Sequence, residues 1–292
     1  MTITEAQQQA SGGGAGVPTV ASRARDWART APNQVAYREK DFGIWNEYTW
    51  ADSWEMIEKA ANGLLALGVQ PGDRVSIHSE DRLEWIIMDL ATVAVRGVTV
   101  GFYPTNPTAE VEYLLTDCGA CIHFAEDQEQ YDKVLDIGRE KLSALRKIIF
   151  AEPRGMVGRE YREAHPGELE ARMAAAEDAD LMTLVYTSGT TGPPKGAMLT
   201  NKNANYCIEK IVKAGGRVVG GLPGPGDEIV TYLPLCHVAE RIFSTWTQVG
   251  MGPTLNFAES IDTVNENLRE IQPTLFFAVP RIWEKLHALT LI

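Results

Sequence analysis

Strand-like and helix-like segments alternate along most of this 292-residue chain. Short apolar runs such as 74–78 and 147–150 are typical of buried strands, and the segments between them carry apolar residues at helical spacing. Parallel strands need such crossover helices, which then cover both faces of the sheet. The alternation therefore predicts an α/β fold with two doubly wound sheet units.

Local signals fix several element boundaries. Thr49, followed three residues later by Asp52, is typical of a helix N-cap, and Gly68 suits the left-handed position at the helix end. Pro107 is expected at the first position of a later helix. We predict further helices over 203–213, 237–248, 263–271 and 281–289, and strands over 74–78, 99–102, 121–124, 147–150, 181–186, 228–233, 254–257 and 274–279.

The chain divides into a polar tail and one large folded region. Residues 1–20 include the run Ser-Gly-Gly-Gly-Ala-Gly and predict a flexible tail, whereas residues 21–292 are predicted to form the folded part. A stretch near 152–180, mixed in charge and rich in small residues, is expected to connect two α/β units. The apolar end at Leu291-Ile292, directly after a predicted helix, suggests a truncated reading frame.

The composition excludes some classes of partner. A formal net charge of −12 argues against nonspecific nucleic-acid binding, which needs a basic face. No run is long and uncharged enough to span a membrane, and the N-terminus lacks the pattern of a secretory signal. We therefore expect a cytoplasmic protein with no transmembrane segment and no nucleic-acid partner, while peripheral membrane contact and the oligomeric state stay open.

Cys118 and Cys121 form a C-x-x-C pair with His123 nearby. A zinc site would need a second ligand pair at a matching spacing, and a redox pair would sit at a helix N-terminus. This pair instead follows a predicted helix, so we interpret both cysteines as packing residues.

The segment from Leu184 to Gly196 carries the strongest functional signal. A buried strand runs directly into a loop of four hydroxyl residues, glycines and one lysine. Glycines let backbone N–H groups turn toward a ligand, hydroxyls add donors, and Lys195 adds a positive charge. A plain surface turn is the alternative, but this combination in one window favours a polyphosphate site.

The loop is not of the Walker A type, because Gly189 and Gly192 are too close together and Gly196 follows Lys195. The contiguous stretch Tyr186 to Thr200 (YTSGTTGPPKGAMLT) instead resembles the phosphate loop of the adenylate-forming superfamily. That superfamily includes acyl-CoA synthetases, luciferases and peptide-synthetase adenylation domains. The resemblance implies that residues 21–292 form the N-terminal domain of such an enzyme, and that this domain is incomplete at its C-terminus.

Two later segments point to the long-chain acyl type. Leu233 to Arg241 (LPLCHVAER) looks like the second conserved block of long-chain acyl-CoA synthetases, in which the position of His237 lies against the acyl and adenylate groups. Pro273 to Lys285 is similar to the long-chain pattern ending VPR-x-W-E-K. From spacing alone His237 would be a surface histidine capping a helix, and Glu240 with Arg241 could equally be an ion pair on a solvated helix face.

The resemblance implies ATP-dependent activation of a fatty acid. The carboxylate would attack ATP to give an acyl-adenylate and pyrophosphate, and coenzyme A would then take the acyl group. Mg²⁺ and donors must neutralise the charge as carboxylate and triphosphate approach. His237 and Lys195 are the implied catalytic residues, and Thr190 or Thr191 would touch Mg²⁺. The implied nucleotide-binding residues are Thr187, Ser188, Gly189, Thr190, Thr191, Gly192 and Lys195.

Several later family elements are missing from the sequence, including the adenine-binding block, the Tyr-Gly-x-Thr-Glu motif and the catalytic lysine of the small C-terminal domain. We therefore expect a fragment that does not catalyse adenylation by itself. Two alternatives stay open: another adenylate-forming ligase, such as a fatty-acyl-AMP or aryl acid ligase, and a noncatalytic nucleotide- or acyl-binding module.

Overall fold

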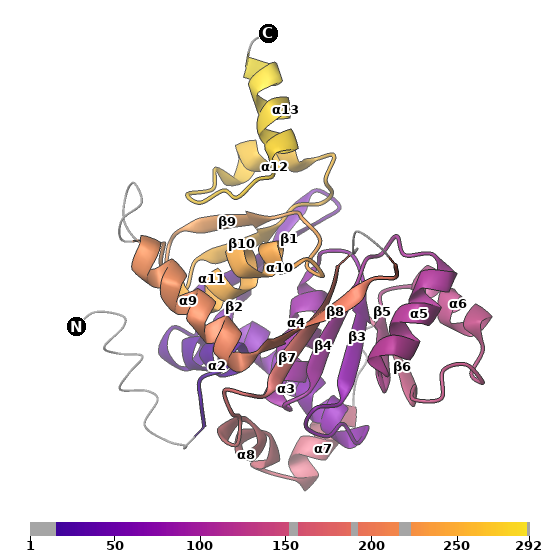
Figure 1. Cartoon of the computed structure of the whole chain (residues 1–292). Helices are drawn as coiled ribbons and strands as arrows, with labels where there is room; N and C mark the ends of the chain where they lie inside the picture. The colour runs from indigo at the N-terminus through magenta and orange to yellow at the C-terminus, as the bar shows by residue number, and fades with distance from the viewer. Residues whose placement is uncertain (1–15, 152–156, 188–191, 216–222, 291–292) are drawn as a thin grey trace.

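Two β-sheets with helices packed between and around them make up the fold (Figure 1). The structure is a computed structural model, and it describes residues 16–151, 157–187, 192–215 and 223–290. The predicted α/β class and the two sheets are confirmed.

The larger sheet has six strands in the order β6-β5-β3-β4-β7-β8. All neighbours in it are parallel except β7 and β8, which form an antiparallel hairpin at one edge. Its strands are β3 (Arg74–His78), β4 (Val98–Phe102), β5 (Ile122–Ala125), β6 (Lys147–Phe150), β7 (Leu181–Thr187) and β8 (Lys195–Thr200).

The smaller sheet has four strands in the order β2-β1-β10-β9. Here β1 and β2 form an antiparallel hairpin, and β10 pairs in parallel with both β1 and β9. Its strands are β1 (Val35–Asp41), β2 (Ile44–Thr49), β9 (Glu228–Thr231) and β10 (Thr254–Phe257).

The helices are numbered in chain order, and one helical stretch contains a π-helical segment labelled η1. They are α2 (Val20–Thr30), α3 (Trp50–Ala66), α4 (Leu83–Ala94), α5 (Thr108–Cys118), α6 (Gln128–Ile137), α7 (Val157–Ala164), α8 (Glu168–Ala174), α9 (Asn201–Gly215), α10 (Val238–Arg241), η1 (Ile242–Trp246), α11 (Thr247–Met251), α12 (Val264–Ile271) and α13 (Pro280–Thr290).

Helix α4 lies at the centre of the molecule. Every residue of α4 except Glu84 is buried, as expected for a helix that is apolar nearly all round. One side of α4 packs on β3 and β4 of the larger sheet, and the other side meets α2 and α3. Helices α5 and α6 cover the opposite face of the larger sheet (Figure 1). A charged residue, Asp89, is therefore enclosed in the middle of this largely apolar helix, one turn before the buried Thr92.

Several local predictions are confirmed. Thr49 is the N-cap of α3 and forms a capping box with Asp52, in which each side chain accepts the backbone N–H of the other residue. Gly68 has a φ of 77° directly after this helix. The predicted bounds of β3, β6 and β10 are those observed.

Other local predictions need correction. Pro107 is the N-cap of α5 and not its first residue, because proline fixes φ (−70°) but leaves ψ free, and ψ here is extended at 158°. The predicted strand over 274–279 is wrong. Within this segment only Leu275 forms a bridge, to Ile229 of β9. Because β9 is short and ends at Thr231, few of its residues can pair with a further strand.

Each sheet takes strands from both sides of the segment 152–180, so this connection does not divide the two sheets. The described part of the segment contains α7 and α8, and α7 packs against α3. Among the described helices none combines the length and hydropathy that a membrane span requires.

Cys118 is the last residue of α5, and Cys121 directly precedes β5. Both thiols are buried, and burial raises the pKa of Cys118 to about 11 and also raises that of Cys121. Neutral, buried thiols fit the packing role rather than a reactive one.

Candidate functional site

The hydroxyl- and glycine-rich segment connects β7 to β8, and these two strands pair as an antiparallel hairpin. Strand β7 ends at Thr187, β8 begins at Lys195, and these two residues lie opposite each other in the antiparallel register. Sequence reasoning expected the loop after β7 but missed β8. Ser188, Gly189, Thr190 and Thr191 lie outside the described residues. Of the predicted nucleotide-binding residues, Thr187, Gly192 and Lys195 can therefore be placed.

Helix α5 holds the hairpin in place on its inner side. The Tyr113 hydroxyl donates to the carbonyl oxygen of Pro194 at 2.8 Å, and the Tyr186 hydroxyl donates to Asp117 at 2.5 Å. Gly192 has a φ of 88°, a conformation that glycine adopts without strain. The hairpin that bears the predicted phosphate site is thus fastened to α5 at two points.

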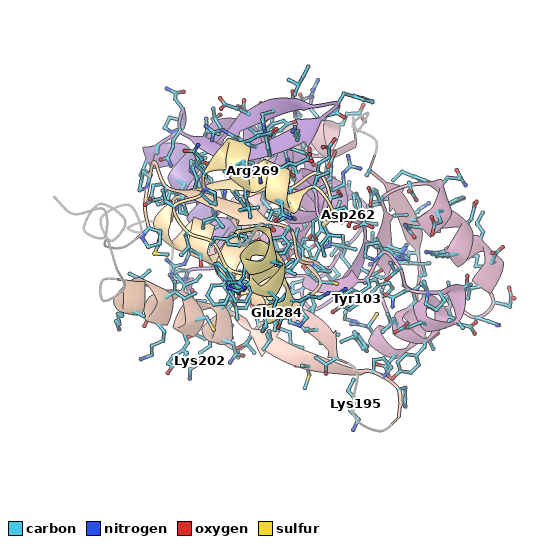
Figure 2. The ribbon with its side chains drawn as sticks, turned by 90° about the horizontal axis from the view of Figure 1, so that it is seen from above. Tyr103, Lys195, Lys202, Asp262, Arg269 and Glu284 are labelled. Atoms are coloured by element: carbon cyan, nitrogen blue, oxygen red, sulfur yellow. The ribbon has the colours of Figure 1, made fainter. Side chains whose placement is uncertain are left out.

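Lys195 is exposed at the base of the hairpin turn and extends outward (Figure 2). Within the described part of the chain its side chain forms no ion pair. An ammonium group without a counter-ion next to a glycine turn is available for an external anion.

A pocket of about 330 Å³ opens between the hairpin, the end of β4, α5 and the start of α10. It brings together Thr187 and His237, which are 50 residues apart in the sequence, but Lys195 and Gly192 are not among the residues that line it. The pocket lies beyond the carboxyl ends of β4 and β7, where open α/β sheets bind ligands. Its lining is Gly101, Tyr103, Asn106, Glu110, Leu114, Val185, Tyr186, Thr187, Pro194, His237 and Val238.

Gly101 on β4 allows the segment that carries His237 to approach the sheet. A Cβ atom at Gly101 would lie 2.7 Å from Cβ and 2.8 Å from Cα of Cys236. Real Cβ atoms do not approach backbone so closely, so any larger residue would displace the chain next to His237. The glycine thereby sets the width of the pocket.

His237 is the N-cap of α10, as the helix-capping interpretation predicted, and it also lines the pocket. Its Nδ1 accepts the backbone N–H of Ala239 at 3.2 Å. In the neutral ring the proton then lies on Nε2, which leaves a donor for an oxygen atom of a ligand. The two interpretations of His237 are therefore compatible.

The segment before His237 is fixed by a half-buried carboxylate. Asp81 accepts the backbone N–H of Leu235 at 2.7 Å. Burial raises the pKa of Asp81 well above its usual value, and this backbone hydrogen bond opposes the rise.

Arg241 anchors the segment after His237. Its guanidinium donates to both carboxylate oxygens of Asp89 on α4, at 2.7 and 2.8 Å, and to the Thr183 hydroxyl on β7 at 2.7 Å. The rings of Trp85 and Trp246 lie 5.4 and 5.9 Å from the guanidinium carbon. The side chains of Arg241 and Asp89 are at most 2% exposed. One buried ion pair thus joins α10, the central helix and the strand that ends at Thr187.

Glu240 is buried as well. It accepts the Thr231 hydroxyl at 2.5 Å, and burial raises the pKa of its carboxyl group to about 7. The alternative of a Glu240–Arg241 ion pair on a solvated helix face is wrong, because both residues are enclosed and Arg241 pairs with Asp89.

Sequence reasoning missed Asp89, Gly101 and Asn106 as residues that build the site. Asp89 carried a usable signal, since a carboxylate in the middle of an apolar helix implies a buried cationic partner. Asn106 is only 6% exposed, and its side-chain oxygen has no hydrogen-bond partner within the described residues. Neither Gly101 nor Asn106 belongs to a pattern that a single sequence reveals.

Comparison with known proteins identifies the family. The model of the family described as AMP-binding enzyme matches residues 24–291. The chain belongs to the AMP-binding enzyme family. Its predicted phosphate loop and its His237 segment both fall within the matched range.

Relatives in this AMP-binding family include long-chain fatty-acid–CoA ligases. The chain is 35% identical to long-chain-fatty-acid–CoA ligase FadD15 of Mycobacterium bovis over 274 residues, which cover 92% of the chain and 44% of that protein. It is 30% identical to the ligase ACSBG2 of Homo sapiens, covering 86% of the chain and 39% of that protein. The chain therefore spans less than half the length of these relatives.

A solved structure supports the fold. The anthranilate CoA ligase AuaEII, determined in complex with anthranoyl-AMP, superposes with a TM-score of 0.76 at 22% identity, covering 92% of the chain and 50% of that protein. At this identity the likeness shows the fold alone.

The first prediction is that Arg241 and Asp89 stabilise the fold as a coupled pair, which a double-mutant cycle can test. Asp89→Leu and Arg241→Met should each lower the free energy of unfolding by about 3–5 kcal/mol, because each leaves a buried charge without its partner. The double variant should lose much less than the sum of the two. Chemical denaturation measures all four proteins.

The exposed pair Lys141–Glu112 provides the matched control, since its cycle should give a coupling of only about 0–1 kcal/mol. Additive losses at Asp89 and Arg241 would contradict the assigned coupling.

A second prediction concerns pH. Because the pKa of Glu240 is raised in the folded state, the native protein holds a proton that the unfolded chain releases, and stability falls as pH rises toward and through about 7. Glu240→Gln cannot ionise but can still accept the Thr231 hydroxyl. Relative to the wild type, the variant should therefore gain about 2–3 kcal/mol between pH 5 and pH 8.

Urea unfolding at both pH values measures this difference, which includes a part from Asp81, because the Glu240 carboxylate helps to raise the pKa of Asp81 and the Gln variant removes that effect. Parallel pH profiles for the two proteins would show that Glu240 does not titrate in this range.

Proposed function

We propose that the protein to which these residues belong is an AMP-forming ligase that activates a long-chain fatty acid and transfers it to coenzyme A. ATP and coenzyme A are the co-substrates of such adenylate-forming ligases. The observation that carries the proposal is the pocket in which the end of the predicted phosphate hairpin, at Thr187, meets His237. The family match and the long-chain ligases among the relatives support the choice of reaction.

In this proposal the β7–β8 hairpin binds the triphosphate. Thr187 offers its hydroxyl from the exposed end of β7, Gly192 permits the sharp turn, and Lys195 supplies a cation that no described carboxylate neutralises. Ser188, Gly189, Thr190 and Thr191 complete the predicted donor set. Positioning and charge neutralisation are the main contributions to catalysis of this type, and no protein nucleophile is required.

Mg²⁺ would join the triphosphate at the hydroxyls of Thr190 or Thr191. The described residues contain no group of three or more His, Cys, Asp or Glu side chains that could hold a metal ion. Mg²⁺ commonly takes few protein ligands and several phosphate and water oxygens, so a site with one or two hydroxyls fits its chemistry. When bound, the ion would neutralise phosphate charge.

His237 is proposed to orient the acyl carboxylate. Its Nδ1 accepts the backbone N–H of Ala239, so in the neutral ring Nε2 carries the proton and can donate it to a ligand oxygen. Tyr103 and Leu114 line the same pocket and would contact the less polar part of the ligand. His237 would thus place the carboxylate next to the phosphates held by the hairpin.

The third prediction tests the role of Lys195 in the protein at its full natural length. Lys195→Gln should lower kcat/KM for ATP-dependent acyl-CoA formation by about 10²–10³-fold, the usual effect of removing one electrostatic group from a transition state. Product formation from palmitate, ATP and coenzyme A measures the change. The matched control is Lys202→Gln, because Lys202 is also exposed but lies on α9 (Figure 2).

Unchanged turnover in Lys195→Gln would refute the assignment of the hairpin. The same assay with benzoate distinguishes a fatty-acid ligase from an aryl acid ligase, and accumulation of acyl-AMP without acyl-CoA in the presence of coenzyme A identifies a fatty-acyl-AMP ligase. Absence of all three products would favour a noncatalytic binding module.

A further inference from the structure

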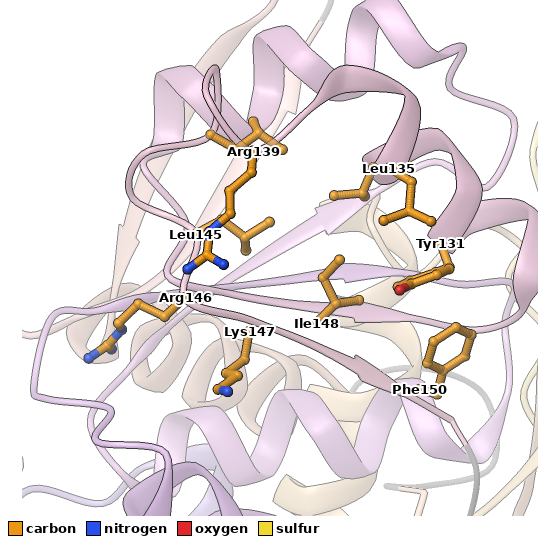
Figure 3. A pocket seen from close by; sticks show the side chains of 10 residues that line it. Tyr131, Leu135, Arg139, Leu145, Arg146, Lys147, Ile148 and Phe150 are labelled. Atoms are coloured by element: carbon orange, nitrogen blue, oxygen red, sulfur yellow. The ribbon is translucent and has the colours of Figure 1, made fainter.

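A second cavity lies at the opposite edge of the larger sheet, between α6 and β6 (Figure 3). Its volume is about 360 Å³, slightly larger than the pocket at His237 and within the range of small-molecule sites. Strands β5, β3 and β4 separate β6 from the β7–β8 hairpin, so the two cavities are distinct. The lining consists of Tyr131, Val134, Leu135, Arg139, Leu142, Leu145, Arg146, Lys147, Ile148 and Phe150.

One end of this cavity is apolar. Leu135 and Phe150 form its margin and are 54% and 37% exposed, while Val134 and Leu142 are buried in the cavity lining. The rings of Tyr131 and Phe150 lie 4.7 Å apart. Exposed side chains of this size, gathered next to a buried apolar floor, form a surface that an apolar chain can cover.

The other end is cationic. All three charged residues in the lining, Arg139, Arg146 and Lys147, are basic, in a chain whose net charge is −12. Arg146 is paired with Asp73 at 2.7 Å, whereas Arg139 and Lys147 form no ion pair with any described residue. Figure 3 shows Arg139 extending toward Leu145 and Arg146, away from the end where Tyr131, Leu135 and Phe150 gather.

We propose that this cavity binds a single-chain fatty carboxylate. The carboxylate pairs with the Arg139 guanidinium, which suits two-point binding of that group. The hydrocarbon chain follows Leu145 and Ile148 to the aromatic pair Tyr131–Phe150. Charge complementarity favours an anion over a neutral or cationic amphiphile.

A peptide strand added to the free edge of β6 is the competing occupant, but β6 has only four residues. Strand addition depends on a ladder of main-chain hydrogen bonds, for which so short an edge offers few partners.

The proposal is independent of the catalytic assignment, because the two cavities share no lining residue. A fatty acid bound here would be an accessory ligand, far from the hairpin that is proposed to hold ATP. Failure of one proposal therefore leaves the other standing.

The test is photo-crosslinking with a diazirine-bearing dodecanoate, used below its critical micelle concentration, followed by mass-spectrometric mapping of the labelled residues. We expect labels within 131–150. Excess dodecanoate should abolish them, and dodecyltrimethylammonium, which has the same chain and the opposite charge, should not. Equal competition by the two amphiphiles would overturn the role of Arg139, and absence of labels within 131–150 would overturn the site.

Two variants sharpen the test. Arg139→Gln removes the cation assigned to the carboxylate, and Leu135→Asp places a carboxylate at the exposed margin of the apolar end; each should reduce labelling within 131–150 at least tenfold. Lys141→Gln is the matched control, because Lys141 lies in the same connection but points to Glu112 and does not line the cavity. Undiminished labelling in Arg139→Gln would contradict the proposal, and circular dichroism establishes that each variant is folded.

Discussion

The buried ion pair between Arg241 and Asp89 is the constraint on which the arrangement of the site depends. Asp89 is held in the centre of an apolar helix, where an unpaired carboxylate would be strongly unfavourable. Arg241 supplies its counter-charge and at the same time donates to Thr183 of β7, whose hydroxyl in turn donates to the carbonyl oxygen of Thr99 on β4. The first turn after His237 is thereby tied to both the central helix and the sheet.

This anchoring explains why residues far apart in the sequence share one pocket. Thr183 lies on the strand that ends at Thr187, so the guanidinium that fixes the His237 segment also fixes its distance from the hairpin. Gly101 lets the segment pack closely, and Asp81 holds the backbone at Leu235. Three separate contacts, from α4, β4 and the loop after β3, thus converge on one short stretch of chain.

The parts of the fold that the sequence predicted well are those decided by near neighbours. The capping box of Thr49 and Asp52 spans three residues, and the apolar runs of β3 and β6 are bounded by their own turns. The loop after β7 and the helix start at His237 were predicted because their local patterns are unusual. Asp89 and Arg241 are 152 residues apart, so no local pattern could predict that they pair. Whether 274–279 forms a strand depends on the length of β9, the strand with which Leu275 makes its single bridge.

The most direct test of one shared site is a crystal structure of the full-length protein with Mg²⁺ and a nonhydrolysable ATP analogue. The account predicts triphosphate oxygens within hydrogen-bond distance of the Thr187 hydroxyl and the Lys195 ammonium, with His237 facing the same ligand across the pocket. A nucleotide bound elsewhere, with the hairpin free of phosphate, would contradict it.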